Sequence, residues 1–317
     1  MQAVILAAGA GKRLHPLTSN RSKAMLPILG KPIVERVVEH FASIRINDFI
    51  LVIHPDDRSI IRYFQRESHL DVDIRFVYQK KPVGTADALQ KAAPLIEDDF
   101  FLSACDNLIA PDHLARMNMI WNSGQDINAL LALIEVEEEQ LTQSAVVELY
   151  KDQVLKIVEK PAPGEALSNI VSLPLYCFSP KLLTVLPEIK PSVRAEYEIQ
   201  SGIQLLIDRY GGVKGVDIDS RITITTPADV LNINQKYLIA GFEQPQIQPQ
   251  SVGKSSSLIT PLYIEKGTVI GANCIIGPNV YIEKNCVIGD YVEIKDSVIL
   301  RDVEIPADTK IVNQIVS

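Results

Sequence analysis

Isoleucine recurs at every sixth position along a stretch near the end of this 317-residue chain. The repeated residues are Ile264, Ile270, Ile276, Ile282, Ile288 and Ile294, with Leu258 and Leu300 continuing the spacing on either side. Four positions after each isoleucine stands a small or β-branched residue: Thr268, Cys274, Val280, Cys286, Val292 and Val298. An apolar period of six is typical of a parallel β-helix, whose stacked coils bury one continuous core. We predict a short left-handed β-helix of fewer than about three coils, because three faces of six residues complete one turn.

Before this repeat, short apolar runs alternate with helical patterns. The runs that predict strands cover residues 2–7, 49–53, 74–78 and 100–104, and the helical patterns cover residues 33–41, 60–64 and 86–93. This alternation predicts a parallel sheet covered by helices on both faces. Ligands bind such sheets beyond the carboxyl ends of the strands. Gly9 and Gly11, after the first strand, and Asp106, after a later one, are therefore expected at one rim of the sheet.

The length of the chain and a change in its composition predict two domains. A chain of 317 residues exceeds the roughly 250–300 residues at which single cores stop growing. Residues 241–257 are rich in proline, glutamine and serine and lack periodicity, which indicates a linker. We therefore predict an α/β domain at 1–240 with a Rossmann-like, mostly parallel sheet, a linker at 241–257, and the β-helix at 258–317.

Charge and composition exclude several classes of protein. The net charge of −8 argues against a nucleic-acid partner, because phosphate backbones are bound by an excess of lysine and arginine. The apolar run Ala3–Ala10 precedes Lys12 and Arg13, the reverse of the order in a signal peptide. No apolar run reaches the ~20 residues of a transmembrane helix, so we expect a cytoplasmic protein without a membrane partner. The cysteines form no CxxC pair, and Cys274 and Cys286 are interpreted as small residues inside the β-helix.

A glycine-rich segment with two cations follows the first predicted strand. It reads LAAGAGKRLHPLTSNRSKAMLPILGKPI over residues 6–33. Gly9 and Gly11 let backbone N–H groups approach a phosphate, and Arg13 and Lys23 add positive charge beside them. The segment resembles the signature of the sugar-1-phosphate nucleotidyltransferases, several branches of which also carry a hexapeptide-repeat tail.

The resemblance implies a reaction and a set of residues for it. An oxygen of a sugar 1-phosphate attacks the α-phosphorus of an NTP and pyrophosphate leaves, which demands alignment and neutralisation of charge. In the family, the residues that match Arg13 and Lys23 hold the triphosphate and stabilise charge on the α-phosphate. The residues implied in nucleotide binding by this segment are Leu6, Ala8, Gly9 and Gly11.

A second nucleotide motif is QKKPVGTADAL, in which Gln79 precedes Gly84 and Thr85. A similar spacing in the family places a glutamine side chain and a glycine backbone against the edge of the base. A primary amide offers a donor and an acceptor, which suits the imide edge of uracil or thymine. We therefore favour UTP or dTTP as the nucleotide.

Two further motifs indicate the residues that bind the metal ion and the sugar phosphate. Asp106 succeeds a predicted strand and suits Mg²⁺, which binds through one or two carboxylates plus substrate phosphates. Cys105 replaces the glycine that usually precedes this aspartate in the family. Glu159 and Lys160 match the family's Glu-Lys-Pro motif, in which the acid accepts hydrogen bonds from sugar hydroxyls and the lysine holds the sugar phosphate. The resemblance also implies sugar-phosphate contacts for Asn107 and Asn169, and a catalytic role for Lys160.

The second metal ligand has to be assigned by alignment with the family. Aligning Thr225-Thr226-Pro227 to a late Gly-Thr-Pro tripeptide puts Thr223 where many relatives have an aspartate, and a hydroxyl is a poor replacement for a carboxylate. Another branch ends this region with Asn-Asn-Arg, and Asp219 then matches the first asparagine. We predict that Asp219 joins Asp106 at Mg²⁺, with Asp217 as the fallback.

Departures from the family pattern leave two alternatives open. Ser172-Leu173-Pro174 and Gln200-Ser201 replace residues that line the sugar side in relatives. They motivate a non-catalytic regulatory subunit that binds nucleotide-sugar and pairs with an active relative. A β-helix that transfers acetyl groups is the other alternative. Such sites in relatives generally use a histidine as the base, but all five histidines of this chain lie at or before position 113, outside the β-helix. The short β-helix exposes apolar surface, so we expect a homo-oligomer formed through it.

Overall fold

The computed structural model of the protein describes residues 1–124, 126–241 and 246–317. The chain divides into two compact units. Unit 1 comprises Met1–Ala10 and Val34–Ile222, and unit 2 comprises Gly11–Ile33 and Thr223–Ser317. The glycine-rich segment is thereby divided between the units after Ala10. Within the described ranges, no helix has both the length and the apolar character needed to cross a membrane.

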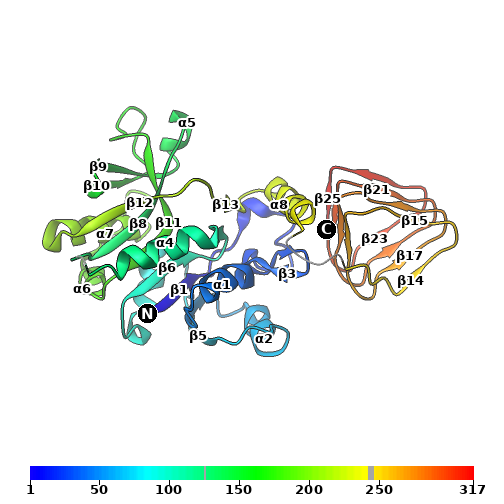
Figure 1. Ribbon diagram of the computed structural model, residues 1–317, viewed down its shortest axis with the longest axis horizontal. Helices are drawn as coiled ribbons and strands as arrows, with labels where there is room; N and C mark the ends of the chain where they lie inside the picture. The colour runs from blue at the N-terminus through cyan, green and yellow to red at the C-terminus, as the bar shows by residue number, and fades with distance from the viewer. Residues whose placement is uncertain (125, 242–245) are drawn as a thin grey trace. The chain divides into compact units, whose positions relative to one another are not determined.

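Unit 1 is built on a nine-stranded sheet with the strand order β5-β4-β1-β6-β11-β8-β12-β10-β9 (Figure 1). The strands are β1 (Gln2–Leu6), β4 (Asp48–Ile53), β5 (Asp73–Tyr78), β6 (Phe100–Ala104), β8 (Ala129–Glu135), β9 (Ala145–Tyr150), β10 (Gln153–Glu159), β11 (Ile170–Phe178) and β12 (Val213–Asp217). β5, β4, β1 and β6 run parallel, as the alternating pattern predicts, and their bounds match the predicted ones to within one residue. β11 runs antiparallel to β6 and β8. A separate pair is formed by β7 (Asn107–Leu108) and β13 (Ile222–Thr223).

Helices pack on both faces of this sheet. They are α1 (Ile33–Ser43), α2 (Arg58–Arg66), α3 (Thr85–Ala92), α4 (Pro111–Trp121), α5 (Glu138–Leu141), α6 (Lys181–Val185) and α7 (Ile199–Tyr210), with 3-10 turns η3 (Ala93–Leu95) and η4 (Leu186–Glu188). Val4 and Ile50 share one core cluster with residues of α3, α6 and α7. On the opposite face, Phe41 of α1 packs against Phe49 and Phe101. Because both faces are buried, the strands are continuous apolar runs.

A bulge interrupts β11 where the sequence departs from the family pattern. The register of β11 against β8 shifts between Ser172 and Tyr176, and Pro174 lies inside that shift. Proline has no N–H to donate, so a central strand accepts it only at such an irregularity. Ser172-Leu173-Pro174, which replaces residues that line the sugar side in the family, therefore lies within a strand.

Unit 2 contains a three-sided parallel β-helix (Figure 1). Its strands are β14 (Ser251–Val252), β15 (Ser257–Leu258), β16 (Leu262–Ile264), β17 (Val269–Ile270), β18 (Ile275–Ile276), β19 (Val280–Ile282), β20 (Val287–Ile288), β21 (Glu293–Lys295), β22 (Val298–Ile299), β23 (Glu304–Ile305), β24 (Lys310–Val312) and β25 (Ile315–Val316). The unit also contains η1 (Lys12–Leu14), η2 (Lys23–Met25), β2 (Pro27–Ile28), β3 (Lys31–Pro32) and α8 (Pro227–Ala240). The parallel stacking confirms the predicted β-helix and is consistent with the left-handed form. Cys274 and Cys286 lie inside its core, as expected.

The β-helix is longer than predicted. Each side has four strands, which contradicts the prediction of fewer than three coils. The extension comes from strands that the unbroken repeat does not include. Val252 pairs with Ile270 before the repeat, and Ile305 and Ile311 continue the core after it.

The repeat slips once within the predicted series, and a second time after Asp308, where the corner residue Asn313 follows after five positions. Ile282 pairs with Ile299 rather than with Leu300, so this coil is one residue shorter than the preceding ones. Corner residues with positive φ mark the slip, because Tyr291 is followed by Asp296 after five positions instead of six. Ile299 therefore lies in the core cluster, and the assignment of Leu300 to the inward series is wrong.

The observed division of the chain differs from the predicted boundaries. β14 lies within the predicted linker 241–257, where Ile247 also bridges to Ile264; residues 242–245 of that linker lie outside the described residues. Residues 11–33 and 223–240, predicted within the domain 1–240, group with the β-helix in unit 2. Such grouping depends on tertiary contacts, which hydrophobic periodicity does not report.

Candidate active site

In unit 1, the predicted rim carries the residues that follow β1. The carbonyl oxygen of Leu6 accepts a hydrogen bond from the N–H of Cys105 at 3.1 Å. Ala8 is buried and Gly9 is exposed. A Cβ at Gly9 would meet no atom of the described residues within 4 Å. The backbone of Gly9 is therefore open to an approaching ligand.

Gly84 is held against the segment that precedes α7. Its φ is +129°, and an added Cβ would lie 2.2 Å from the carbonyl oxygen of Tyr197, so only glycine fits. The N–H of Tyr197 donates to Val83 at 2.8 Å, and its carbonyl accepts from the N–H of Ala86 at 2.9 Å. This close pairing fixes the backbone of the nucleotide motif. Tyr197 is a residue of this site that the sequence reasoning did not identify.

The side chains of the same motif are engaged within the protein. Gln79 is buried, and its Nε2 donates to the carbonyl of Gly84 at 3.0 Å and to Asp87 at 2.8 Å. Both N–H groups of Nε2 are thus used within the protein, and Oε1 is the remaining hydrogen-bonding atom of this side chain. The hydroxyl of Thr85 accepts a hydrogen bond from the N–H of Ile199 at 3.1 Å, at the first turn of α7.

Asp106 and Asn107 follow the end of β6, and both are buried. The Nδ2 of Asn107 donates to the carbonyl of Pro174 at 3.2 Å, at the bulge in β11. The Oδ1 of Asn107 is buried and has no hydrogen-bond partner among the described residues. Buried polar atoms are normally paired, so this oxygen is a candidate ligand atom. A carboxylate and an amide oxygen are the donor types that Mg²⁺ prefers.

Asp219 lies beyond the end of β12 and contacts His113. Its side chain is 91% exposed, and its Oδ2 is 3.8 Å from the Nε2 of His113. The backbone N–H of Asp219 donates to the same nitrogen at 3.4 Å. Asp217 is the last residue of β12 and is also exposed. His113 was not identified from the sequence.

A further cation lies in this region. Burial lowers the pKa of Arg221, and the negative charge of Asp106 opposes that shift. Arg221 therefore contributes positive charge to the surroundings of Asp106. Among the described residues, no group of three or more His, Cys, Asp or Glu side chains could hold a metal. An ion at Asp106 would thus need oxygens from its substrates.

The sugar-side acid lies at the end of β10. Lys160 has a φ of 48°, and its Nζ is 3.5 Å from Glu159 Oε1. Burial raises the pKa of Glu159, and the charge of Lys160 opposes this shift. Glu159, Glu198 and Gln200 line an open cavity of about 560 Å³ beside α7. Acceptors around such a cavity suit the hydroxyl groups of a sugar.

The residues that depart from the family pattern have structural contacts here. The Nε2 of Gln200 donates to the hydroxyl of Tyr176 at 3.3 Å, and Tyr176 is buried in β11. The hydroxyl of Ser172 is buried as well. Asn169 is exposed, and its amide donates to Glu135. Sequence reasoning singled out Gln200 but not Tyr176.

In unit 2, the remainder of the glycine-rich segment folds back on itself. Gly11 has a φ of +61°, and its carbonyl accepts from the hydroxyl of Thr18 at 3.1 Å. An added Cβ at Gly11 would lie 3.1 Å from the Cβ of Lys23. The fold therefore brings Lys23 beside Gly11, as a phosphate clamp requires. Arg13 is exposed in η1.

Comparison with known proteins places this arrangement in a family. The model of the nucleotidyl transferase family matches residues 2–221. The chain belongs to the nucleotidyl transferase family. A model named GMPPB C-terminal domain matches residues 258–317. The first match contains every strand of the nine-stranded sheet, and the second covers most of the β-helix.

Individual relatives of this nucleotidyl transferase agree with the match. The bifunctional protein GlmU of Methanococcus maripaludis strain C5 is 32% identical over 240 residues, which are 75% of this chain and 54% of that protein. The chain thus spans about half the length of that relative. The UTP--glucose-1-phosphate uridylyltransferase AglF of Haloferax volcanii is 30% identical over 230 residues, 72% of this chain and 93% of that protein. A UDP-glucose pyrophosphorylase solved with UDP-glucose superposes with a TM-score of 0.68 at 23% identity, over 75% of this chain and 98% of its own, which confirms the fold.

Proposed function

We propose that this chain transfers a nucleotidyl group from UTP or dTTP to a sugar 1-phosphate, releasing pyrophosphate and forming an NDP-sugar. The family membership and the likeness to AglF, a uridylyltransferase by name, support the reaction class. The observation that carries the proposal is the pair of buried oxygen-bearing side chains, Asp106 and Asn107, at the end of β6. They lie where a parallel sheet binds its ligands.

The proposed roles follow from the charges of the reaction. A phosphate oxygen of the sugar 1-phosphate attacks the α-phosphorus, and the bond to pyrophosphate breaks. Arg13 and Lys23 neutralise the triphosphate, and Lys160 holds the phosphate of the sugar. Glu159 accepts hydrogen bonds from sugar hydroxyls. Oε1 of Gln79 and the backbone of Gly84 receive the base.

We propose Mg²⁺ as the cofactor. Asp106 would hold the ion with Asp219 as the second carboxylate, and the unpaired Oδ1 of Asn107 is a further oxygen of the right type. When bound, the ion neutralises charge that develops on the phosphates. The side chain of Asp219 lies beside His113 and is exposed to solvent, so an ion can reach it.

The alternative function is a regulatory subunit that binds nucleotide-sugar without turning it over. The observation that favours it is the contact of Gln200 with Tyr176, which replaces a sugar-lining residue of relatives by an internal hydrogen bond. The positive charge of Arg221 near Asp106 also favours the regulatory alternative, because it opposes the binding of a metal cation at Asp106.

A pyrophosphate-release screen separates the two functions. Purified protein with Mg²⁺ is tested against five NTPs and a panel of sugar 1-phosphates. We expect release with UTP or dTTP and a hexose 1-phosphate. Nucleotide binding, measured by calorimetry, without turnover of any pair would establish the regulatory alternative instead.

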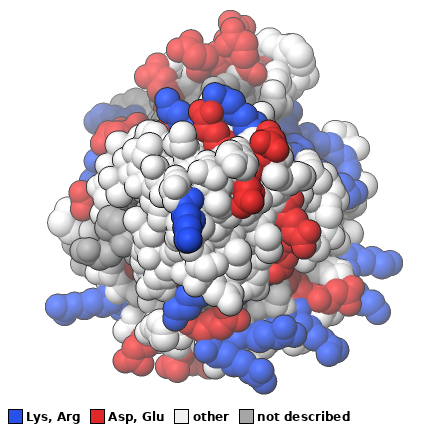
Figure 2. Space-filling view, turned by 90° about the vertical axis from the view of Figure 1, so that its right-hand side faces the viewer, with Lys and Arg blue, Asp and Glu red and all other residues white. Residues whose placement is uncertain are grey.

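We also propose that the β-helix forms a homo-oligomer. Ile275, Val287 and Tyr291 are exposed on it. Figure 2 shows a largely uncharged area at the centre of the face that lies at the right of Figure 1, with charged side chains around it. Contiguous exposed apolar surface can mark a protein–protein interface, and a second copy is the partner we propose.

Light scattering on the full chain tests this assembly. We expect an oligomer for the wild type and a smaller species for the double variant Ile275→Lys/Val287→Lys. Ser257→Lys is the matched control, because Ser257 is exposed and pairs with Ile275 on the same side of the β-helix. A monomeric wild type, or a double variant that assembles like the control, would refute the proposal.

A further inference from the structure

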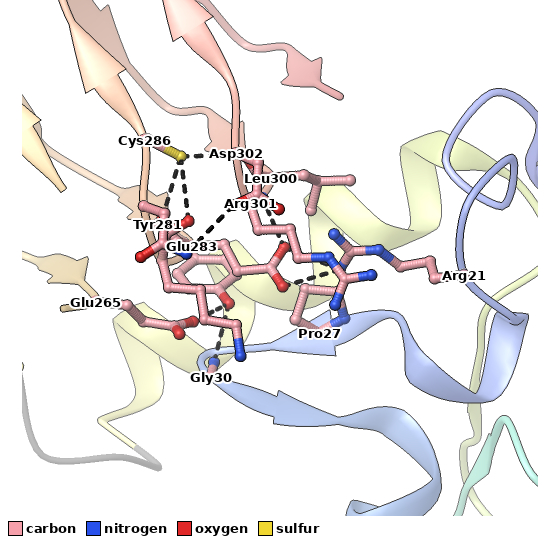
Figure 3. Close-up of polar contacts among 12 residues, drawn as sticks. Arg21, Pro27, Gly30, Glu265, Tyr281, Glu283, Cys286, Leu300, Arg301 and Asp302 are labelled. Carbon is pink, nitrogen blue, oxygen red and sulfur yellow. Dashed lines mark hydrogen bonds and ion pairs between the residues drawn. The ribbon is translucent and has the colours of Figure 1, made fainter. Parts of the chain in front are cut away.

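The segment of unit 2 that carries Lys23 is attached to the β-helix by a buried ion pair. Nη1 of Arg21 lies 2.9 Å from both Oε1 and Oε2 of Glu283. The two side chains are only 3% and 7% exposed. Figure 3 shows Arg21 extending to Glu283, which comes from the β-helix. Because Arg21 is two residues before Lys23, this attachment lies directly beside the proposed phosphate-binding cation.

The partner carboxylate is itself held in place. Oε2 of Glu283 accepts a hydrogen bond from the backbone N–H of Arg301, in the next coil, at 2.8 Å. The carboxylate thus has a guanidinium on one side and a backbone donor on the other. Charge-assisted hydrogen bonds are the stronger kind, and here one guanidinium nitrogen is shared by both carboxylate oxygens. The carboxylate of Glu283 is therefore held in position on the β-helix, and Arg21 binds it there.

A second attachment follows Lys23 in the sequence. The N–H of Gly30 donates to the hydroxyl of Tyr281 at 3.2 Å, and that hydroxyl donates to Glu265 at 2.5 Å (Figure 3). The N–H of Leu29 donates to Oδ1 of Asn234 in α8 at 2.9 Å. Lys23 lies between these contacts and the ion pair of Arg21. The segment is thus fixed on both sides of Lys23 by groups outside it.

We propose that the β-helix positions the phosphate-binding segment, and that Arg21 and Glu283 are the positioning pair that sets the placement of Lys23. This inference rests on the proposed function, since it concerns the same triphosphate. Neither residue touches substrate; both act through the backbone that carries Lys23. The β-helix is accordingly part of the apparatus that binds the triphosphate, in addition to its proposed role in assembly.

The isosteric change Glu283→Gln tests the inference on the full chain. It removes the charge that holds Arg21 and leaves the shape of the side chain. We expect the affinity for UTP and the kcat each to fall by about tenfold or more, because misplacing a catalytic group by about 1 Å costs up to 10²-fold. The affinity for UMP, which lacks the β- and γ-phosphates, should stay within about twofold of wild type, because unit 1 residues are proposed to receive the base. Calorimetry with UTP and UMP and pyrophosphate release provide the measurements.

Matched variants separate positioning from general loss of structure. Glu304→Gln makes the same change at an exposed position of the β-helix and should behave as wild type. Arg21→Lys keeps the charge and should retain more UTP affinity than Arg21→Met does. These two variants test the pair from its other side if Glu283→Gln does not fold. Equal losses for UTP and UMP, or no loss in Glu283→Gln, would overturn the inference.

The outcomes also separate this inference from the proposed function. If wild type binds UTP without turnover and Glu283→Gln weakens UTP alone, the positioning role stands and the catalytic function fails. If wild type turns over and Glu283→Gln matches Glu304→Gln, the function stands and the positioning role fails. A wild type that binds neither nucleotide refutes both.

Discussion

Replacing Lys23 with alanine should lower kcat for pyrophosphate release by a factor of ~10² or more, the scale lost with one group that stabilises developing charge. The fold brings Lys23 beside Gly11, which has the left-handed backbone conformation that glycine adopts readily. Removing the ammonium leaves that backbone without its adjacent cation. The measurement is initial rate at saturating UTP and hexose 1-phosphate, with the unfolding temperature recorded in parallel.

Lys12→Ala is the matched control for this change. Lys12 is an exposed lysine of the same segment, directly before Arg13, and has no proposed role. We expect near wild-type turnover for it. Retention of more than about a tenth of wild-type kcat in Lys23→Ala would show that other groups neutralise the triphosphate, and the role of Lys23 would have to be abandoned.

Much of the fold could be predicted from local pattern. The strands of the parallel half of the sheet are buried on both faces, so each appears as a continuous apolar run whose ends are easy to locate. The six-residue repeat identified the β-helix because the coils from Leu258 to Ile294 repeat the same inward positions. These features depend on residues near one another in sequence or on strict periodicity.

The features that could not be predicted depend on contacts between distant segments. The ion pair of Arg21 with Glu283 joins residues 262 positions apart, and no periodicity indicates it. The slip at Asp296 removes one residue from a corner, which leaves Leu300 apparently in register. Pro174 reads as a strand breaker, whereas a bulge accommodates it in β11. In each case tertiary packing decides among local alternatives that the sequence allows.

The candidate site shows the same division. Motif spacing placed Asp106, Gln79 and Gly84 after the correct strands, because the carboxyl ends of parallel strands share one rim. It did not show that the donors of Gln79 are used by Gly84 and Asp87. Nor did it show the contact between Asp219 and His113. Residue types therefore indicated the chemistry, while the atoms that remain available for it required the structure.

Replacing Asp106 with asparagine should reduce Mg²⁺-dependent turnover by about 10²-fold or more, because the ion supplies several kcal/mol of charge stabilisation in such reactions. Asp106 is buried at the end of β6, and asparagine keeps its shape while removing its charge. The Mg²⁺ concentration that gives half-maximal rate should rise with the loss of kcat. Asp112→Asn, the same change at an exposed residue of α4, should leave both quantities unchanged. An unchanged Mg²⁺ requirement in Asp106→Asn would remove this residue from the metal site.

The same titration assigns the second ligand. If Asp219 holds the ion, Asp219→Asn raises the half-maximal Mg²⁺ concentration more than Asp217→Asn does. The structure adds a competitor, because the buried Oδ1 of Asn107 has no partner among the described residues. A larger shift in Asn107→Ala than in Asp219→Asn would assign the second oxygen to Asn107 and contradict the role of Asp219. If none of the three variants shifts the titration, Asp106 is the only carboxylate of the site. A hard cation usually keeps one or two carboxylates beside the substrate phosphates, so that result would strengthen the case for a regulatory subunit.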